Sequence, residues 1–164
     1  GDAPSPWGQS PSVVAYQPPT VEDRSHQGIT FDLALGVGST SQEATTASGT
    51  FGLGLWVHRK ASVTFRATAV ASYTFVGGTA QFYPTRKMWV GVGAGQMRLT
   101  IDNPNPNGYP YYIETGGRAA VLRAGYNVYD HGRNAIYFSG DLIAGDIEGE
   151  AELVGTMNIG YQLL

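Results

Sequence analysis

The sequence contains no cysteine and little charge of either sign. The lack of cysteine excludes disulfides, thiol nucleophiles and cysteine-ligated metals. Charged residues make up 14% of the chain, against about 25% in an average soluble protein. The net charge of -3 gives no basic surface for nucleic acid, so we expect no nucleic-acid partner. There is also no uninterrupted run of about 18 apolar residues, so no transmembrane helix is predicted.

Glycine and aromatic residues are abundant by contrast. The chain has 23 glycines among 164 residues and is 12% aromatic, a composition typical of a β protein rich in turns. Proline is concentrated at the start, at Pro4, Pro6, Pro11, Pro18 and Pro19. Such a composition favours extended chain over a packed core. We therefore predict a Pro-rich N-terminal arm over residues 1–28 and one β domain over residues 29–164.

The last twelve residues alternate between apolar and polar or small side chains. Successive side chains of a β-strand point to opposite faces, so one face is apolar and the other polar. Leu153, Met157, Ile159, Tyr161 and Leu163 form the apolar face, and Thr156, Asn158 and Gln162 form the polar face.

The same alternation recurs along the chain and predicts eight strands. The runs lie near residues 29–38, 50–58, 61–75, 79–83, 88–95, 120–128, 136–144 and 153–164, with a bulge expected near Gln96. Most have the roughly 9–11 residues that a tilted strand needs to cross a bilayer.

The connections between these runs predict an orientation. Residues 58–60, 84–87 and 130–134 are short links, whereas residues 39–47, 102–110 and the acidic 145–150 are mostly longer and lack Lys and Arg. The exception is a tight turn expected at Val76-Gly77-Gly78. Short turns on one side and longer loops on the other are typical of bacterial outer-membrane barrels, whose short turns face the periplasm. Both termini are then expected on the periplasmic side.

The set opposite the apolar residues indicates which face is inside. It consists mainly of Gly, Ala, Ser and Thr, which cover a water-exposed surface poorly but fit the narrow interior of an eight-stranded barrel. Aromatic residues near strand ends, at Phe75, Tyr126, Phe138 and Tyr161, are interpreted as an interfacial girdle. The fold class is therefore an all-β, eight-stranded antiparallel up-and-down transmembrane β-barrel, closed because hydrocarbon tolerates no unpaired strand edge.

Four charged residues are predicted to point into this interior: Asp32, Arg66, Arg123 and Asp141. A hairpin centred on Gly132 makes Arg123 and Asp141 cross-strand neighbours, and one centred near Lys60 puts Arg66 opposite Gly54. Because an unpaired buried charge costs several kcal/mol, we expect these side chains to form a network of ion pairs that plugs the lumen. A proton or ion path through them is the alternative.

The strand pattern, the stretch Met88-Trp89-Val90-Gly91-Val92-Gly93-Ala94-Gly95 and the terminal strand resemble the OmpA/OmpX-like family of small eight-stranded outer-membrane β-barrels. The resemblance covers roughly residues 29–164 and implies residence in the bacterial outer membrane and assembly by the barrel-assembly machinery. Family members usually end in an aromatic residue, where this chain has Leu163 and Leu164. The family includes anchors, adhesins, small-molecule conduits and enzymes, so the fold does not decide the function.

The leading prediction is a non-catalytic membrane protein, a structural anchor or a subunit of a cell-envelope assembly, without cofactor or metal. One alternative is a soluble lipocalin-like barrel that binds a ligand, with Thr64, Arg66 and Thr68 facing water. The other is a lipid-modifying outer-membrane enzyme. Because His58 and His131 fall in predicted periplasmic turns and no Gly-x-Ser-x-Gly motif occurs, the enzyme is disfavoured.

Two groups of aromatic residues are candidate partner surfaces. Trp7 and Tyr16 in the arm are expected to dock on the barrel or on another envelope protein. Tyr109, Tyr111 and Tyr112 follow an Asn-Pro-rich loop, and exposed tyrosines are favoured at interfaces. The expected surroundings of the barrel itself are outer-membrane lipid and lipopolysaccharide.

Overall fold

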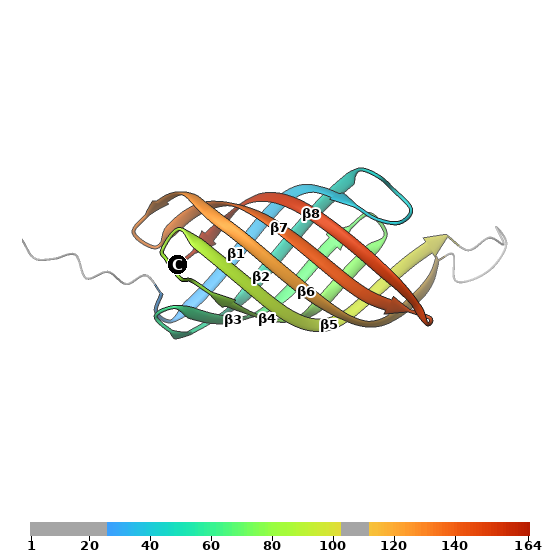
Figure 1. Cartoon of the computed structure of the whole chain (residues 1–164), viewed down its shortest axis with the longest axis horizontal. Coiled ribbons are helices and arrows are strands. Elements are labelled where there is room, and N and C mark those ends of the chain that lie inside the picture. Colours follow the sequence, from blue (N-terminus) through green and yellow to red (C-terminus); the bar gives the residue numbers. More distant parts are fainter. Residues whose placement is uncertain (1–25, 103–111) are drawn as a thin grey trace, which may run out of the picture.

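The computed structural model describes residues 26–102 and 112–164 and shows a closed antiparallel β-barrel of eight strands in chain order (Figure 1). The predicted all-β, eight-stranded antiparallel up-and-down barrel is confirmed, and residues 1–25 of the predicted Pro-rich arm lie outside the described residues. The strands are β1 (Ile29–Ser39), β2 (Thr46–His58), β3 (Ala61–Val70), β4 (Tyr73–Phe82), β5 (Met88–Asp102), β6 (Tyr112–His131), β7 (Asn134–Ile147) and β8 (Glu150–Leu163). The described ranges contain no helix long and apolar enough to cross a membrane.

Closure comes from pairing of the first strand with the last. β1 and β8 are antiparallel partners from Asp32–Gln162 to Ser39–Gly155. Every strand therefore has two hydrogen-bonded neighbours and the ring of strands is closed, although the part of β6 before Ala119 pairs with β5 alone. The predicted faces of the terminal strand are confirmed: Thr156, Asn158 and Gln162 are buried, whereas Leu153, Met157 and Ile159 are exposed.

The exterior of the barrel is apolar on all eight strands. Large apolar side chains that are 40% or more exposed occur on each of them. One example from each strand, in order from β1 to β8, is Leu33, Leu53, Phe65, Val76, Val92, Leu122, Phe138 and Met157. These residues alternate with buried ones, so apolar residues face outward from the sheet, the reverse of a soluble barrel.

The turn between β3 and β4 differs from the prediction. The strands are joined at Ala71–Ser72, and Val76-Gly77-Gly78 lies inside β4 rather than at a turn. The turn carries no Gly, Pro or Asn to mark it, and Ala71 itself takes a left-handed backbone, with φ 52°. A run that was predicted to be one long strand over residues 61–75 is therefore two strands.

This turn also reverses the predicted position of one aromatic residue. Phe75 was assigned to the exterior girdle, but its side chain is 1% exposed and lies in the interior. Tyr126 and Phe138 are exposed at 45% and 53%, as the girdle prediction requires. Phe75 has room inside because Gly77 beside it has no side chain: a Cβ there would lie 2.8 Å from the Phe75 ring.

Register irregularities lie elsewhere than at Gln96, where pairing continues unbroken with both neighbouring strands. The shifts occur between Trp56 and His58 in β2 and between Asn127 and Tyr129 in β6. Both lie next to a turn at one end of the barrel, a common place for bulges, which bend the strand locally.

The connections at the two ends of the barrel were predicted to differ in length. The links 59–60, 83–87 and 132–133 lie at the end where β1 begins and β8 finishes; the links 40–45, 71–72 and 148–149 lie at the other. The predicted difference in length is wrong for the described links, since two at each end have only two residues. The acidic segment 145–150 is mostly strand, with a tight turn at Glu148 (φ 53°) and Gly149 (φ 84°), as in a two-residue hairpin.

Candidate functional site

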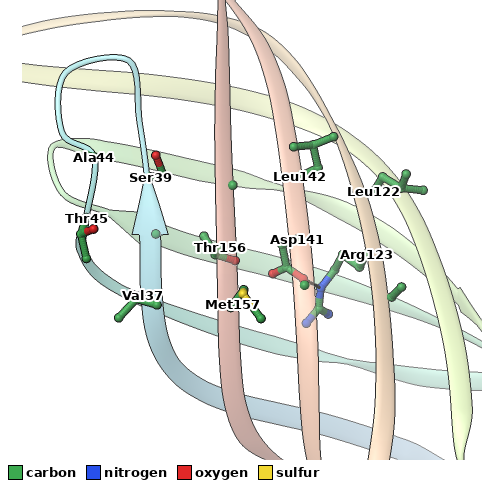
Figure 2. A pocket seen from close by; sticks show the side chains of 14 residues that line it. Val37, Ser39, Ala44, Thr45, Leu122, Arg123, Asp141, Leu142, Thr156 and Met157 are labelled. Atoms are coloured by element: carbon green, nitrogen blue, oxygen red, sulfur yellow. Dashed lines mark hydrogen bonds and ion pairs between the residues drawn. The ribbon is translucent and has the colours of Figure 1, made fainter.

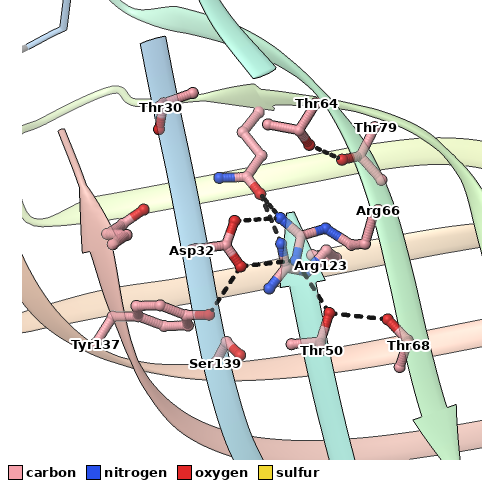
Figure 3. Close-up of polar contacts among 12 residues, drawn as sticks. Thr30, Asp32, Thr50, Thr64, Arg66, Thr68, Thr79, Arg123, Tyr137 and Ser139 are labelled. Carbon is pink, nitrogen blue, oxygen red and sulfur yellow. Dashed lines mark hydrogen bonds and ion pairs between the residues drawn. The ribbon is translucent and has the colours of Figure 1, made fainter. Parts of the chain in front are cut away.

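The barrel interior is divided into three layers of side chains along its axis. One end of the barrel is the end where β1 begins and β8 finishes, and it is called the end near the termini below. An apolar and aromatic cluster lies there and includes Trp56, Tyr83, Trp89, Tyr137 and Leu164. At the opposite end lies a second apolar cluster of Val70, Tyr73, Phe75, Met97, Leu99, Ala119, Val121, Ile143, Ile147 and Val154. Between them the buried residues are polar or charged. The candidate site is this middle layer (Figure 3).

Arg66 and Asp32 form a two-pronged ion pair in the middle layer. Arg66 Nη1 donates to Asp32 Oδ1 at 2.7 Å, and Nη2 donates to Oδ2 at 2.5 Å. Tyr137 donates its hydroxyl to the same Oδ1 at 3.1 Å, and Thr50 Oγ1 accepts from Arg66 Nη1 at 3.0 Å. Parallel guanidinium–carboxylate bonds of this kind are among the strongest that proteins make.

A glycine makes room for the Arg66 guanidinium, but it is not the predicted one. Arg66 is paired with Gly52, whereas Gly54 is paired with Thr64. A Cβ on Gly52 would lie 2.5 Å from Arg66 Nη2. The prediction was wrong by two residues because a two-residue turn at Arg59–Lys60 and the adjacent irregularity in β2 shift the register.

Arg123 and Asp141 form the second ion pair. They are direct cross-strand partners on β6 and β7, and Arg123 Nε donates to Asp141 Oδ1 at 2.9 Å. The Arg123 guanidinium also lies over the Trp89 ring, 5.0 Å from its centroid. The layer thus holds two arginines, each paired with one aspartate, and this pairing limits the electrostatic cost of burying the four charges.

Gln81 connects the two ion pairs. Its Oε1 accepts from Arg123 Nη1 at 2.6 Å and from Arg66 Nη2 at 3.1 Å, so one amide contacts both arginines. The structure brings Asp32, Arg66, Arg123 and Asp141 together in one hydrogen-bonded cluster. Sequence reasoning missed Gln81, although its position in the alternation of β4 would have placed it on the inner face.

A chain of polar contacts leads from Gln81 toward the end near the termini. Gln81 Nε2 donates to the Tyr83 hydroxyl at 2.9 Å, and this hydroxyl donates to Gln162 Oε1, also at 2.9 Å. Gln162 Nε2 in turn donates to Asn127 Oδ1 at 2.5 Å. All four side chains are buried at 3% exposure or less. The contacts tie β4, β6 and β8 together across the interior.

Three buried polar atoms of the four charged side chains have no hydrogen-bond partner among the described residues: Arg66 Nε, Arg123 Nη2 and Asp141 Oδ2. Arg123 and Asp141 also line a hollow of about 450 Å³ in the wall formed by β1, β6, β7 and β8 (Figure 2). The rest of its lining is mostly small or apolar, including Ala124, Gly140 and Gly155, and contains no histidine.

The histidines lie at the end near the termini. His58 closes β2 and His131 closes β6, and both are exposed. His26 stacks on Trp56, with ring centroids 4.1 Å apart and planes at 7°. Within residues 26–102 and 112–164, no three His, Asp or Glu side chains gather as a metal site requires. His58 and His131 thus lie on the surface at this end, and His26 packs against the aromatic cluster there through Trp56 and Tyr83.

The predicted partner surfaces are largely beyond the described ranges. Trp7, Tyr16, Tyr109 and Tyr111 lie outside them. Tyr112 is the first residue of β6, and its backbone pairs with Asp102 of β5.

Comparison with known proteins shows that this chain is similar to solved structures in its fold. No family model and no curated protein matches the sequence. The crystal structure of neisserial surface protein A aligns over 85% of this chain and 97% of that one, with 14% identity and a TM-score of 0.53. The N-terminal β-barrel domain of Pseudomonas aeruginosa OprF aligns over 84% and 98%, with 15% identity and a TM-score of 0.55. The predicted resemblance is confirmed for the fold: the chain has the architecture of the small OmpA/OmpX-like eight-stranded barrels.

Proposed function

We infer that the chain is a non-catalytic integral β-barrel of the bacterial outer membrane, serving as an anchor or as a subunit of an envelope assembly. The observation that carries this proposal is the exterior, where every strand exposes large apolar side chains. A soluble monomer rarely exposes more than a few hundred Å² of continuous apolar surface. An apolar belt around a closed barrel fits hydrocarbon instead, because a closed ring of paired strands presents no open sheet edge to the lipid.

The interior argues against the soluble lipocalin-like alternative. That alternative requires Thr64, Arg66 and Thr68 to face water, yet their exposures are 6%, 0% and 3%. It also requires an apolar interior for the ligand, whereas the middle of this barrel carries two ion pairs. The distribution of polar and apolar residues is that of a membrane barrel.

The interior also supports a closed lumen. Ions would have to pass the aromatic cluster at one end, the guanidinium–carboxylate cluster in the middle and the apolar cluster at the other end. An eight-stranded barrel has space in its interior for little more than side chains. The ion pairs therefore act as a structural plug in this proposal, with no role as a relay.

The even number of strands brings the start of β1 and the end of β8 to the same end of the barrel. Gln27 and Ile29 at the start of β1 accept hydrogen bonds from Arg133, which also donates to the backbone oxygen of Leu164. Both described chain ends thus meet at one end of the barrel, which we assign to the periplasm. The Pro-rich arm would then be available there to other envelope proteins, through Trp7 and Tyr16.

Conductance tests the closed lumen. We expect the refolded protein to migrate faster on gels when unheated than when boiled, as folded membrane barrels do, and to insert into phospholipid vesicles. In planar bilayers it should then give no steady open channels, because side chains obstruct the whole axis. Long-lived, sizeable channels from protein that shows the gel shift would contradict the plug but leave membrane residence intact.

Protein that stays soluble without detergent and does not enter vesicles would contradict membrane residence itself. Absence of any change in lipid A when the chain is expressed separates the proposal from the lipid-modifying enzyme. A new acylation state of lipid A would overturn the non-catalytic assignment.

A further inference from the structure

The two ends of the barrel carry opposite charge. At the end near the termini every turn contains Lys or Arg, namely Arg59 and Lys60 after β2, Arg86 and Lys87 after β4, and Arg133 after β6. The one acidic residue of the described ranges at this end is Asp130, which forms an ion pair with Arg86. The opposite end is acidic, since its two arginines, Arg98 and Arg118, are outnumbered by Glu43, Asp146, Glu148, Glu150 and Glu152.

The cations at the end near the termini are not all used within the barrel. Arg86 belongs to the ion pair with Asp130, and Arg133 donates to three backbone oxygens. Arg59, Lys60 and Lys87 are exposed, and their side chains form no ion pair or hydrogen bond with another described residue. These three, called the basic turn residues below, are therefore available to an external anion.

The backbone holds the basic turn residues in place. The Tyr83 N–H donates to the Lys60 carbonyl oxygen at 2.8 Å and links the turn after β2 to the segment after β4. The Asn127 N–H donates to the Lys87 carbonyl oxygen at 2.7 Å and links that segment to β6. An anion bound here would have to order side chains but no loop, which lowers the entropic cost of binding.

The apolar exterior reaches the basic turn residues directly. Val57, two positions before Arg59, is 63% exposed, and Met88, which follows Lys87, is 56% exposed. If the barrel spans a membrane, as proposed above, the three cations lie where hydrocarbon gives way to headgroups. Lys and Arg clustered at a membrane edge attract anionic lipids. We propose that the basic turn residues bind the headgroups of anionic phospholipids in the leaflet at this end of the barrel.

Two observations favour a phospholipid over an acidic protein as the partner. The cations are distributed over separate turns along the rim, each beside an exposed apolar residue, so a lipid could place its headgroup on a cation and its acyl chains on the adjoining wall. The acidic residues at the other end oppose the same lipids there, so the binding is confined to one leaflet. The barrel would then distinguish the two leaflets by charge.

Lipid selectivity of the inserted full chain tests this inference. The chain is folded into phosphatidylcholine vesicles that contain spin-labelled phosphatidylglycerol or, separately, spin-labelled phosphatidylcholine with the same acyl chains. Electron spin resonance then measures how strongly each labelled lipid associates with the barrel. We expect phosphatidylglycerol to associate about fivefold more strongly at low ionic strength, with a smaller preference at high salt.

Matched variants locate the preference at one end. Lys60→Gln combined with Lys87→Gln should reduce it to about twofold, and Arg59→Gln in addition should abolish it. Arg98→Gln combined with Arg118→Gln removes two charges from the opposite end and should leave the preference at its original value. All five positions are exposed, and the gel shift on boiling verifies that each variant is folded.

Equal association of the two labelled lipids with the wild type would overturn the inference. Glu22 and Asp23 lie outside the described residues, and neutralisation of the turns by them would give this same result. A preference that survives the loss of all three cations would also overturn it. So would displacement of labelled phosphatidylglycerol at constant ionic strength by polyglutamate, which would indicate an acidic protein, or by glycerol phosphate, which would indicate a soluble anion.

These failures are distinguishable from a failure of the proposed function. Selectivity is measured on protein that has already inserted, so its absence leaves membrane residence intact. Failure of the wild type to insert into vesicles would refute the membrane proposal instead.

Discussion

Arg66→Met should lower the free energy of unfolding by about 3–5 kcal/mol, the cost of leaving one partner of a buried ion pair alone. Arg66 is 0% exposed and fixes Asp32, Thr50 and Gln81. Its loss leaves the Asp32 carboxylate in the interior with only the Tyr137 hydroxyl as a hydrogen-bond donor among the bonds shown by the described side chains. The measurement is equilibrium unfolding by denaturant of the barrel folded in phospholipid vesicles.

Two further variants make this result interpretable. Arg59→Met makes the same substitution at an exposed turn and should change stability by no more than about 0.5 kcal/mol. Adding Asp32→Leu to Arg66→Met removes both charges and should restore most of the loss, because a buried ion pair can be replaced by apolar residues at little net cost. A loss below about 1 kcal/mol in Arg66→Met, as for an exposed pair, would contradict the buried cluster.

Phe65→Arg should cost about 2–4 kcal/mol in vesicles, the penalty of an arginine on the lipid face at the bilayer midplane. Phe65 lies in the middle of β3 and is 55% exposed on the outer wall. In a soluble barrel the same substitution would replace an exposed apolar residue by a charged one, with little effect or a gain in solubility. The expected loss therefore depends on hydrocarbon around the barrel.

Phe82→Arg is the matched control for this substitution. Phe82 is the last residue of β4 and is 48% exposed, at the end of the barrel near the termini. Because an arginine near the membrane interface can reach water, the cost there should be only about 0–1 kcal/mol. Equal effects of the two substitutions would show that depth in a membrane does not determine them.

The sequence was most informative where a strand obeys the simple rule of apolar outside and polar inside. β8 follows this rule from Leu153 to Gln162, except that Val154 points inward. The hairpin around Gly132 was also readable, since the distance of Arg123 and Asp141 from one turn determines that they face each other. In β8 the two-residue alternation of apolar and polar side chains was enough to assign the faces of the strand, and in the Gly132 hairpin the position of the turn was enough to assign the cross-strand pair.

The rule failed where the interior itself is apolar. Phe75 was assigned to the exterior girdle, yet it belongs, with Tyr73, to the apolar layer that closes one end of the lumen. The turn before them, at Ala71–Ser72, has none of the usual turn residues, so no local signal revealed the change of face. Hydrophobicity alone cannot distinguish lipid from a dry interior, because both exclude water.

The ion-pair cluster of the middle layer could be predicted only in part from the sequence. Charged residues on an otherwise small-residue face marked Asp32, Arg66, Arg123 and Asp141 as inward. Their partners across the barrel depend on strand tilt and stagger, which no single hairpin determines. Gln81 bridges arginines on β3 and β6, and Tyr137 of β7 reaches Asp32 of β1. Such contacts between distant strands required the three-dimensional structure.

The most direct test of a membrane-spanning barrel is depth-dependent quenching along β3. The chain has no cysteine, so single cysteines at the outward positions Val63, Phe65, Ala67 and Ala69 can each carry a fluorophore without background. In vesicles of brominated lipids, the account predicts quenching of all four, strongest at positions 65 and 67 when bromine lies deep in the acyl chains. Uniform absence of lipid quenching, together with full quenching by a water-soluble agent, would contradict it.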